Sequence, residues 1–230
     1  MHEESALLQF AHTLHWYALA FMGLVYIIRI TWFVKRFKAG GERQASTGIP
    51  GRTTPSKGVA YSLGNVMMPW AMESSRKRPL FYLQFVAFHL GVTSAILLLF
   101  IIPLAPGLLE NQAVIWGLQG CIGAAFLVGL GRIVRRLGDK HMRAISSPDD
   151  YFSLILLTVW FFFSFLAAPN STDNGEWHLL GYFFLASFFL FYVPFSKISH
   201  YLYYPFTRYY IGKSLGHRGV FPIVRGPVRG

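Results

Sequence analysis

Apolar residues follow one another in long blocks along this chain and do not alternate with polar ones. Five blocks stand out, at about residues 7–34, 80–104, 113–134, 151–168 and 177–204. An α-helix rises ~1.5 Å per residue, so about 20 apolar residues cross the ~30 Å hydrocarbon layer of a membrane. The pattern therefore predicts an all-α integral membrane protein, a bundle of five transmembrane helices.

Composition supports the same fold class. Hydrophobic residues make up 53% of the 230 residues and charged residues only 13%, against about 25% charged in soluble domains. So few charges leave no room for a separate soluble domain, and we expect no nucleic acid among the partners despite a net charge of +11. The single cysteine, Cys121, excludes an internal disulfide framework and a cysteine-ligated cluster.

The basic residues predict the orientation of the bundle. Nine Lys and Arg lie in the first long loop, residues 35–79, five lie between Arg132 and Arg143, and six lie from Lys197 to the end. The acidic leader and the other two connections contain none. By the positive-inside rule, the N-terminus lies outside, and the 35–79 loop and the basic tail at 205–230 lie in the cytoplasm.

Two segments outside the spans are long enough to contact partners: the 35–79 loop and the basic tail. The 35–79 loop is rich in Gly, Ser, Thr and Pro, which predicts a mostly irregular conformation. The tail places basic residues among glycines and prolines. It suits either binding to anionic lipid or docking of a cytoplasmic subunit, and the sequence favours neither.

Histidines at membrane depth are the strongest candidates for chemistry, because an ionisable group there is costly unless it is paired or liganded. A haem held between helices takes one imidazole from each side, at matching depth. His89 lies in the second block, toward the cytoplasmic side. His178 and His200 lie at the two ends of the fifth block. A single histidine in a membrane helix also serves as an interhelical hydrogen-bonder, which is the alternative. The candidates are His12, His15, His89, His178 and His200.

Two short stretches carry a resemblance to a known family. Phe88-His89-Leu90-Gly91 and the stretch from Pro194 to His200 resemble the matching parts of the gamma subunit of respiratory nitrate reductase, a five-span cytochrome b. The stretch Met68–Glu73 and the long loop look closer to related membrane subunits of transmembrane redox complexes in sulfate-reducing bacteria. The resemblance implies that His89 and His200 are the axial ligands of a haem b near the cytoplasm. It also implies that Lys197 pairs with a haem propionate.

The chain departs from that family at the outer haem. Leu99 and Tyr182 stand where the family has its outer ligands, and neither replaces an imidazole. Either the outer haem is lost, or His178 holds it together with His15 or His12 from the first helix. His12 and His15 share one helical face, and we expect a second haem with His15 and His178 as its ligands.

The sequence thus predicts a membrane cytochrome b subunit that carries electrons between the quinone pool, for example menaquinone, and a partner redox subunit. The partner would be an iron–sulfur or multihaem subunit of a larger complex, in a bacterial or archaeal cytoplasmic membrane. One alternative is a haem-free membrane anchor. A proton-conducting transporter is disfavoured, because all ten Asp and Glu lie in loops or at helix ends. Polar residues that could assist a quinol site, or simply pack helices, are Gln84, Thr93, Ser94 and Gln119.

Overall fold

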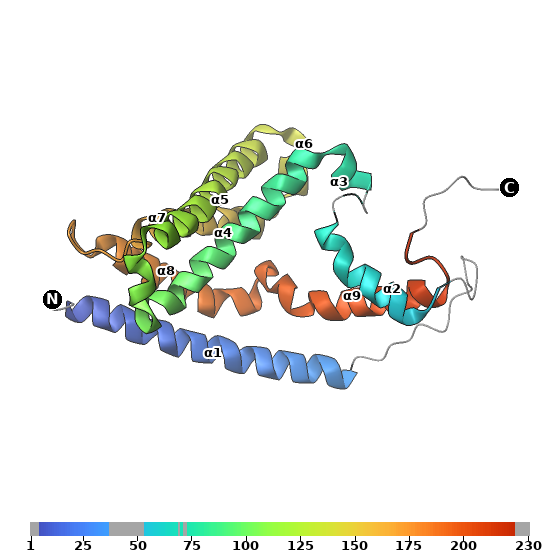
Figure 1. Ribbon diagram of the computed structural model, residues 1–230, viewed down its shortest axis with the longest axis horizontal. Coiled ribbons are helices and arrows are strands. Elements are labelled where there is room, and N and C mark those ends of the chain that lie inside the picture. Colours follow the sequence, from blue (N-terminus) through green and yellow to red (C-terminus); the bar gives the residue numbers. More distant parts are fainter. Residues whose placement is uncertain (1–4, 37–52, 69, 71–72, 224–230) are drawn as a thin grey trace. The chain divides into compact units, whose positions relative to one another are not determined.

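The computed structural model describes residues 5–36, 53–68, 70 and 73–223, and all its regular elements are helices (Figure 1). Short 3₁₀ helices lie at Asn65–Met67, Pro106–Glu110, Val193–Phe195 and Lys197–Ser199. The α-helices are α1 (Ala6–Arg36), α2 (Pro55–Gly64), α3 (Glu73–Lys77), α4 (Pro79–Leu104), α5 (Gln112–Gly138), α6 (Lys140–Ile145), α7 (Pro148–Ala167), α8 (Trp177–Tyr192) and α9 (His200–His217).

Five of these segments are long and apolar enough to cross a membrane: α1, α4, α5, α7 and the stretch Trp177–Phe195 that contains α8. Many of their large apolar side chains are exposed, as lipid-facing positions are; Leu24, Ile27 and Ile28 are each more than half exposed. The predicted fold class, an all-α protein with five spans, is confirmed. The chain is a multi-pass membrane protein.

The fifth span ends earlier than the sequence suggested. We expected one helix from residue 177 to about 204, but α8 stops at Tyr192 and two 3₁₀ helices separate it from α9. Pro194 lacks an amide hydrogen and cannot donate to the preceding turn. His200 is consequently the first residue of α9 and not part of the fifth span.

The chain divides into two compact units. Unit 1 comprises Met1–Tyr26 and Leu83–Ile198, and unit 2 comprises Ile27–Tyr82 and Ser199–Gly230. Each unit is described by itself below.

Polar residues mark the helix starts of unit 1. The side chain of Asn111 accepts a hydrogen bond from the Ala113 amide at 2.9 Å, which caps α5. Before α7, the Ser147 amide donates to the carboxylate of Asp150 at 2.8 Å, and Pro148 occupies the first helical position. These caps satisfy amides that would otherwise lack partners at each helix end.

The N-terminal ends of α1 and α8 are tied together by one polar contact. The Ser5 amide donates to the Glu176 carboxylate at 3.1 Å, and the Ser5 hydroxyl donates to the other carboxylate oxygen. These hydrogen bonds to the ionised form lower the pKa of Glu176 below its ordinary value. The carboxylate therefore keeps its charge, and its contact with α1, to a lower pH than a free glutamate would.

Helices α4 and α5 of unit 1 approach each other closely at Gly91. A Cβ added to this glycine would lie 2.2 Å from the Cβ of Ala125 and 2.8 Å from the carbonyl oxygen of Cys121. Small residues at such crossings let membrane helices pack backbone against backbone. Fully buried aromatic and aliphatic side chains fill the remaining interior, among them Leu98, Ile122, Phe161, Tyr182 and Phe183.

Unit 2 contains regular helices within the loop that was expected to be mostly irregular. Residues 55–64 form α2, which Thr54 caps, and α2 packs along α9 through glycines. A Cβ on Gly58 would lie 2.3 Å from the carbonyl oxygen of Gly212, so only glycine allows this contact. The Arg208 side chain also donates to the Ser62 carbonyl at 2.8 Å. The rest of the loop (37–52, 69 and 71–72), the leader (1–4) and the end of the tail (224–230) lie outside the described residues.

We expect Gly91→Ala to destabilise unit 1 by about 1–3 kcal/mol, the usual range for overpacking a tight contact. Its added methyl group meets Ala125 and a backbone oxygen. Gly120→Ala is the matched control, because a Cβ there meets nothing within 4 Å. Thermal unfolding followed by circular dichroism in detergent measures both variants, and equal midpoints would contradict the crossing.

In unit 2, Gly212→Ala should separate α2 from α9, since the new Cβ would lie 2.6 Å from the Val59 Cα. Faster trypsin cleavage at Lys57, on α2, reports that loss of packing. Gly64→Ala serves as the control, because its Cβ makes only an ordinary 3.5 Å contact with the end of the Met68 side chain. Equal cleavage rates in the two variants would argue against a packed pair.

Candidate functional site

His89 lies in α4, ten residues after the helix start, or about 15 Å along its axis. Its Nδ1 is 2.8 Å from the carbonyl oxygen of Phe85, one turn earlier. A carbonyl only accepts hydrogen bonds, so Nδ1 carries the proton of the neutral ring. The Nε2 atom is then left with its lone pair, and the side chain is exposed at the surface of unit 1.

Aromatic rings frame this imidazole. The ring of Phe85 lies 4.2 Å from that of His89, centroid to centroid, and the ring of Phe88 lies at 6.2 Å. Phe88 turns inward and packs edge-on against Phe161 at 5.3 Å. The side chain of Thr93 donates to the backbone carbonyl of His89 at 2.9 Å. An apolar frame around one nitrogen lone pair suits a flat, largely apolar ligand with an electrophilic metal centre.

His200, the expected second ligand of that haem, belongs to unit 2 and His89 to unit 1. His200 is exposed at the first turn of α9, next to Tyr201. The structure therefore places each residue within its own unit, and their pairing stays a prediction.

His12 and His15 lie together on the inner face of α1 in unit 1. Both rings pack against Phe183 of α8, with centroid distances of 4.3 Å and 5.7 Å. His15 is completely buried, and neither of its ring nitrogens has a hydrogen-bond partner among the described residues. Leaving one such buried group unpaired costs about 1–3 kcal/mol. The ring nitrogens of His15 therefore do not contribute hydrogen bonds to the stability of the described fold.

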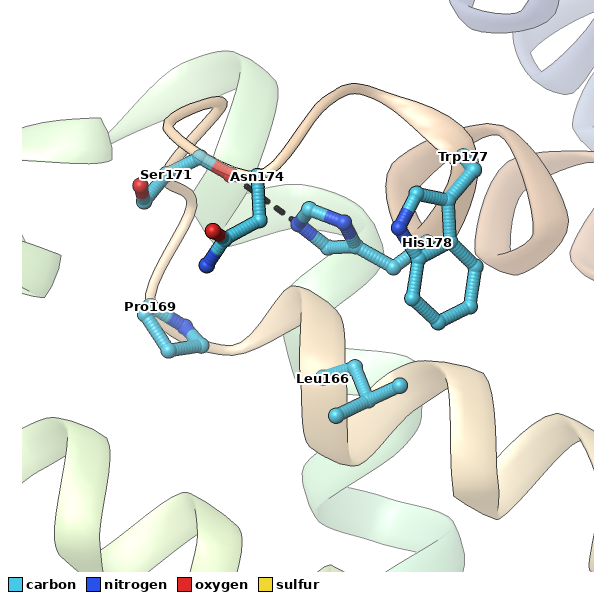
Figure 2. Close-up of a pocket in the computed structure, with 6 residues that line it drawn as sticks. All are labelled: Leu166, Pro169, Ser171, Asn174, Trp177 and His178. Atoms are coloured by element: carbon cyan, nitrogen blue, oxygen red, sulfur yellow. Dashed lines mark hydrogen bonds between the residues drawn. The ribbon is translucent and has the colours of Figure 1, made fainter.

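His178 points toward the turn between α7 and α8 (Figure 2). Its Nε2 lies 2.9 Å from the carbonyl oxygen of Ser171, to which it donates. The same turn holds a cavity of about 260 Å³, below the range of about 300–1,000 Å³ typical of drug-sized ligand sites. A haem on His15 and His178 through Nε2 would require this hydrogen bond to break. The cavity is lined by Leu166, Pro169, Ser171, Asn174, Trp177 and His178.

The two positions that replace the family's outer haem ligands are both built into the core. Leu99 is 3% exposed and Tyr182 is not exposed at all. The Tyr182 hydroxyl donates to the Ala95 carbonyl at 2.7 Å, which joins α8 to α4. The ring of Trp160 stacks parallel to that of Tyr182 at 6.0 Å. Side chains thus occupy the space between α4 and α8 at this level.

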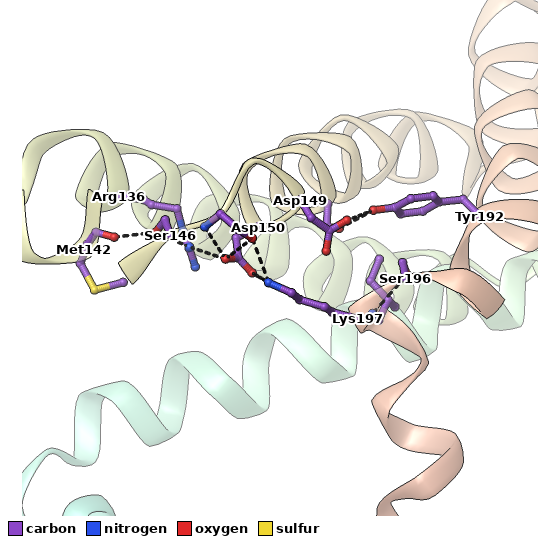
Figure 3. Close-up of polar contacts among 11 residues, drawn as sticks. Arg136, Met142, Ser146, Asp149, Asp150, Tyr192, Ser196 and Lys197 are labelled. Carbon is purple, nitrogen blue, oxygen red and sulfur yellow. Dashed lines mark hydrogen bonds and ion pairs between the residues drawn. The ribbon is translucent and has the colours of Figure 1, made fainter. Parts of the chain in front are cut away.

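Lys197, expected to pair with a haem propionate, is engaged with another helix (Figure 3). Its Nζ donates to the Asp150 carboxylate at 3.1 Å and to the Ser147 hydroxyl at 2.8 Å. Arg136 lies near the same carboxylate, at 3.9 Å. These contacts fasten the end of the fifth span to the start of α7, and they give Lys197 a structural role.

The polar residues proposed to assist a quinol site lie on two helices and have different contacts. Gln119 donates to the Phe165 carbonyl at 3.1 Å, which links α5 to α7. Ser94 is buried, and Gln84 is half-buried on α4. The structure does not bring the four residues together around one cavity that it describes.

Arg132 contacts the residue before His89 and was not among the predicted site residues. Arg132 of α5 places its guanidinium carbon 4.7 Å from the ring centroid of Phe88, the neighbour of His89. Its position at the end of an apolar block made it look like part of the cytoplasmic charge. No local pattern reveals a contact between residues 44 positions apart.

Among the described residues, no group of three or more His, Cys, Asp or Glu side chains gathers as a metal site would require. A haem needs fewer protein ligands, because the porphyrin supplies four nitrogens and the chain only the axial positions.

The chain is similar to a distant homologue in a sulfate-reducing bacterium. A protein of Nitratidesulfovibrio vulgaris, a sulfate-reducing bacterium, is 25% identical over 193 residues, which cover 81% of this chain and 83% of that protein. It is named only "Protein", so it assigns no activity. No family model and no solved structure matches the chain.

Tyr182→Phe should remove the hydrogen bond to Ala95 and lower the free energy of unfolding by about 1 kcal/mol. Tyr17→Phe is the control, because Tyr17 is 71% exposed on α1. Both variants can be compared by thermal unfolding in detergent. If Tyr182→Phe is as stable as the control, the contact between α8 and α4 contributes nothing measurable.

Proposed function

We propose that this chain is a membrane cytochrome b subunit that carries electrons between the quinone pool and a partner redox subunit. The observation that carries the proposal is the state of His89: Nδ1 donates to the Phe85 carbonyl and Nε2 keeps its lone pair. Histidines that bind iron or zinc typically have their other nitrogen held in this way, which fixes the tautomer and the ring orientation.

The surroundings of His89 fit a haem. An exposed imidazole at membrane depth, on an apolar helix, would be costly if it faced lipid alone. The ring of Phe85, exposed beside His89, offers apolar surface to a porphyrin edge. When bound, a haem b supplies reversible one-electron transfer at its iron. His89 would hold that iron from one side, and we propose His200 for the other.

The basic cytoplasmic segments would bind the partner. By the positive-inside rule, α6, the end of α5 and α9 face the cytoplasm, and Lys140, Arg143 and Lys213 are exposed there. Exposed cations attract a partner with an acidic docking face and speed its association. We propose an iron–sulfur or multihaem subunit as this partner, and menaquinone or a similar quinone as the other redox partner.

The resemblance in two short motifs supports this proposal, while the homologue in a sulfate-reducing bacterium bears only on the kind of organism. A bacterial cytoplasmic membrane is the location that fits both. The second haem on His15 and His178 stays a prediction: unpartnered His15 favours it, and the engaged Nε2 of His178 opposes it.

His89→Ala should abolish the spectrum of the inner haem while the chain still inserts into membranes. The pyridine haemochrome of the detergent-purified variant measures haem b per mole of protein. His141→Ala is the matched control, since His141 is an exposed histidine of α6 outside the spans, and it should keep the full haem content. His200→Ala tests the proposed second ligand in the same assay.

An unchanged spectrum in both His89→Ala and His200→Ala would refute the ligand assignment. A colourless wild-type preparation, from cells that make haem b and load another cytochrome, would instead support the haem-free anchor. In that case the histidines would serve only to hold helices and partner subunits together.

A further inference from the structure

Arg132 is a half-buried cation on the inner half of α5, and its guanidinium stacks on a buried ring. Its carbon Cζ lies 4.7 Å from the ring centroid of Phe88, which is only 7% exposed. Arginines at the ends of membrane helices usually extend toward the headgroups. This one is turned inward, against the residue that precedes His89.

Helix geometry explains the inward direction. Arg132 follows Ala125 by seven residues, two helical turns, so both lie on one face of α5. That face meets α4, since Ala125 contacts Gly91. Side chains in a helix lean toward its N-terminus, which here directs the Arg132 side chain back along α4 toward Phe88, the residue before His89.

Arg132 has no acidic partner in the part of the chain that the structure describes. The acidic groups at this end of unit 1 are engaged elsewhere: Asp149 accepts from Tyr192, Asp139 caps α6, and Asp150 binds Lys197. The neighbouring charges Arg135 and Arg136 are of the same sign. A half-buried guanidinium that has no acidic partner among the described residues and has Arg135 and Arg136 on the same helix is suited to an incoming anion.

We infer that Arg132 binds a carboxylate of the ligand held at His89, namely a haem propionate. This inference rests on the proposed function. It moves to Arg132 the role that sequence reasoning gave Lys197, whose ammonium group is already committed to Asp150 and Ser147. The guanidinium fork offers two parallel donors to a carboxylate, and the aromatic face of Phe88 holds the fork in place.

The test compares haem midpoint potentials in the full chain, purified in detergent and reconstituted with either haem b or its dimethyl ester, whose propionates carry no charge. With haem b, Arg132→Gln should lower the equilibrium constant for reduction about tenfold, or about 59 mV for one electron. Pairing with Arg132 neutralises a propionate whose negative charge would otherwise disfavour the reduced form, which has one more negative charge; the ester has no such charge to neutralise. With the dimethyl ester, Arg132→Gln and wild type should differ much less.

Arg135→Gln is the matched control, three residues further along α5 and exposed. Its charge is screened by solvent, so its potential should stay close to that of wild type with both haems. Arg132→Lys keeps the charge but loses the fork, and should bind haem b several-fold more weakly than wild type while binding the ester equally well. This second variant keeps the test decisive if Arg132→Gln does not insert.

The outcomes separate the two proposals. If wild type binds neither haem, the proposed function fails before Arg132 is compared. If wild type binds haem b and Arg132→Gln has the same potential, the Arg132 assignment is overturned and the cytochrome b proposal stands. An equal shift with haem b and with the ester would also overturn it, because the cation would then act on something other than the propionate.

Discussion

Hydrogen-bonding capacity at membrane depth is the constraint on which the rest of this structure depends. The bilayer core offers no water, so each polar atom must find its partner within the protein or in a bound group. The buried hydroxyls of Thr158, Ser164 and Ser187 do so by donating to a carbonyl one turn earlier on their own helix. His89 meets half of its capacity in the same way, and its Nε2 lone pair is left for a ligand.

Polar groups in two parts of unit 1, around Tyr182 and around His89, differ in whether the protein itself supplies their partners. At the level where the resembling family has its outer haem, Tyr182 and Leu99 are packed into the core, and the Tyr182 hydroxyl is satisfied by a helix carbonyl. Around His89, the imidazole is exposed and the Arg132 guanidinium lies against Phe88 without a counter-ion among the described residues. A ligand that is apolar, binds imidazole and carries carboxylates would complement the surroundings of His89. It would find no open position beside Tyr182 and Leu99.

Hydrophobic block lengths were enough to predict the five spans, because the thickness of a bilayer dictates helix length directly. The end of the fifth span at Pro194 and the packing of α2 on α9 were missed. Thr54 and Pro55 formed a readable helix start, yet the partner of Gly58 lies about 150 residues away at Gly212. The same limit concealed the contact of Arg132 with Phe88, whereas His89 was recognisable since an imidazole in an apolar block stands out by itself.

Haem content of the purified chain tests the central claim most directly. A pyridine haemochrome assay on wild-type protein, made in cells that load other b-type cytochromes, should give one haem b per chain, or two if His15 and His178 also hold one. A correctly inserted chain that contains no haem would contradict the account, and would leave His89 as a histidine whose second nitrogen serves a protein partner.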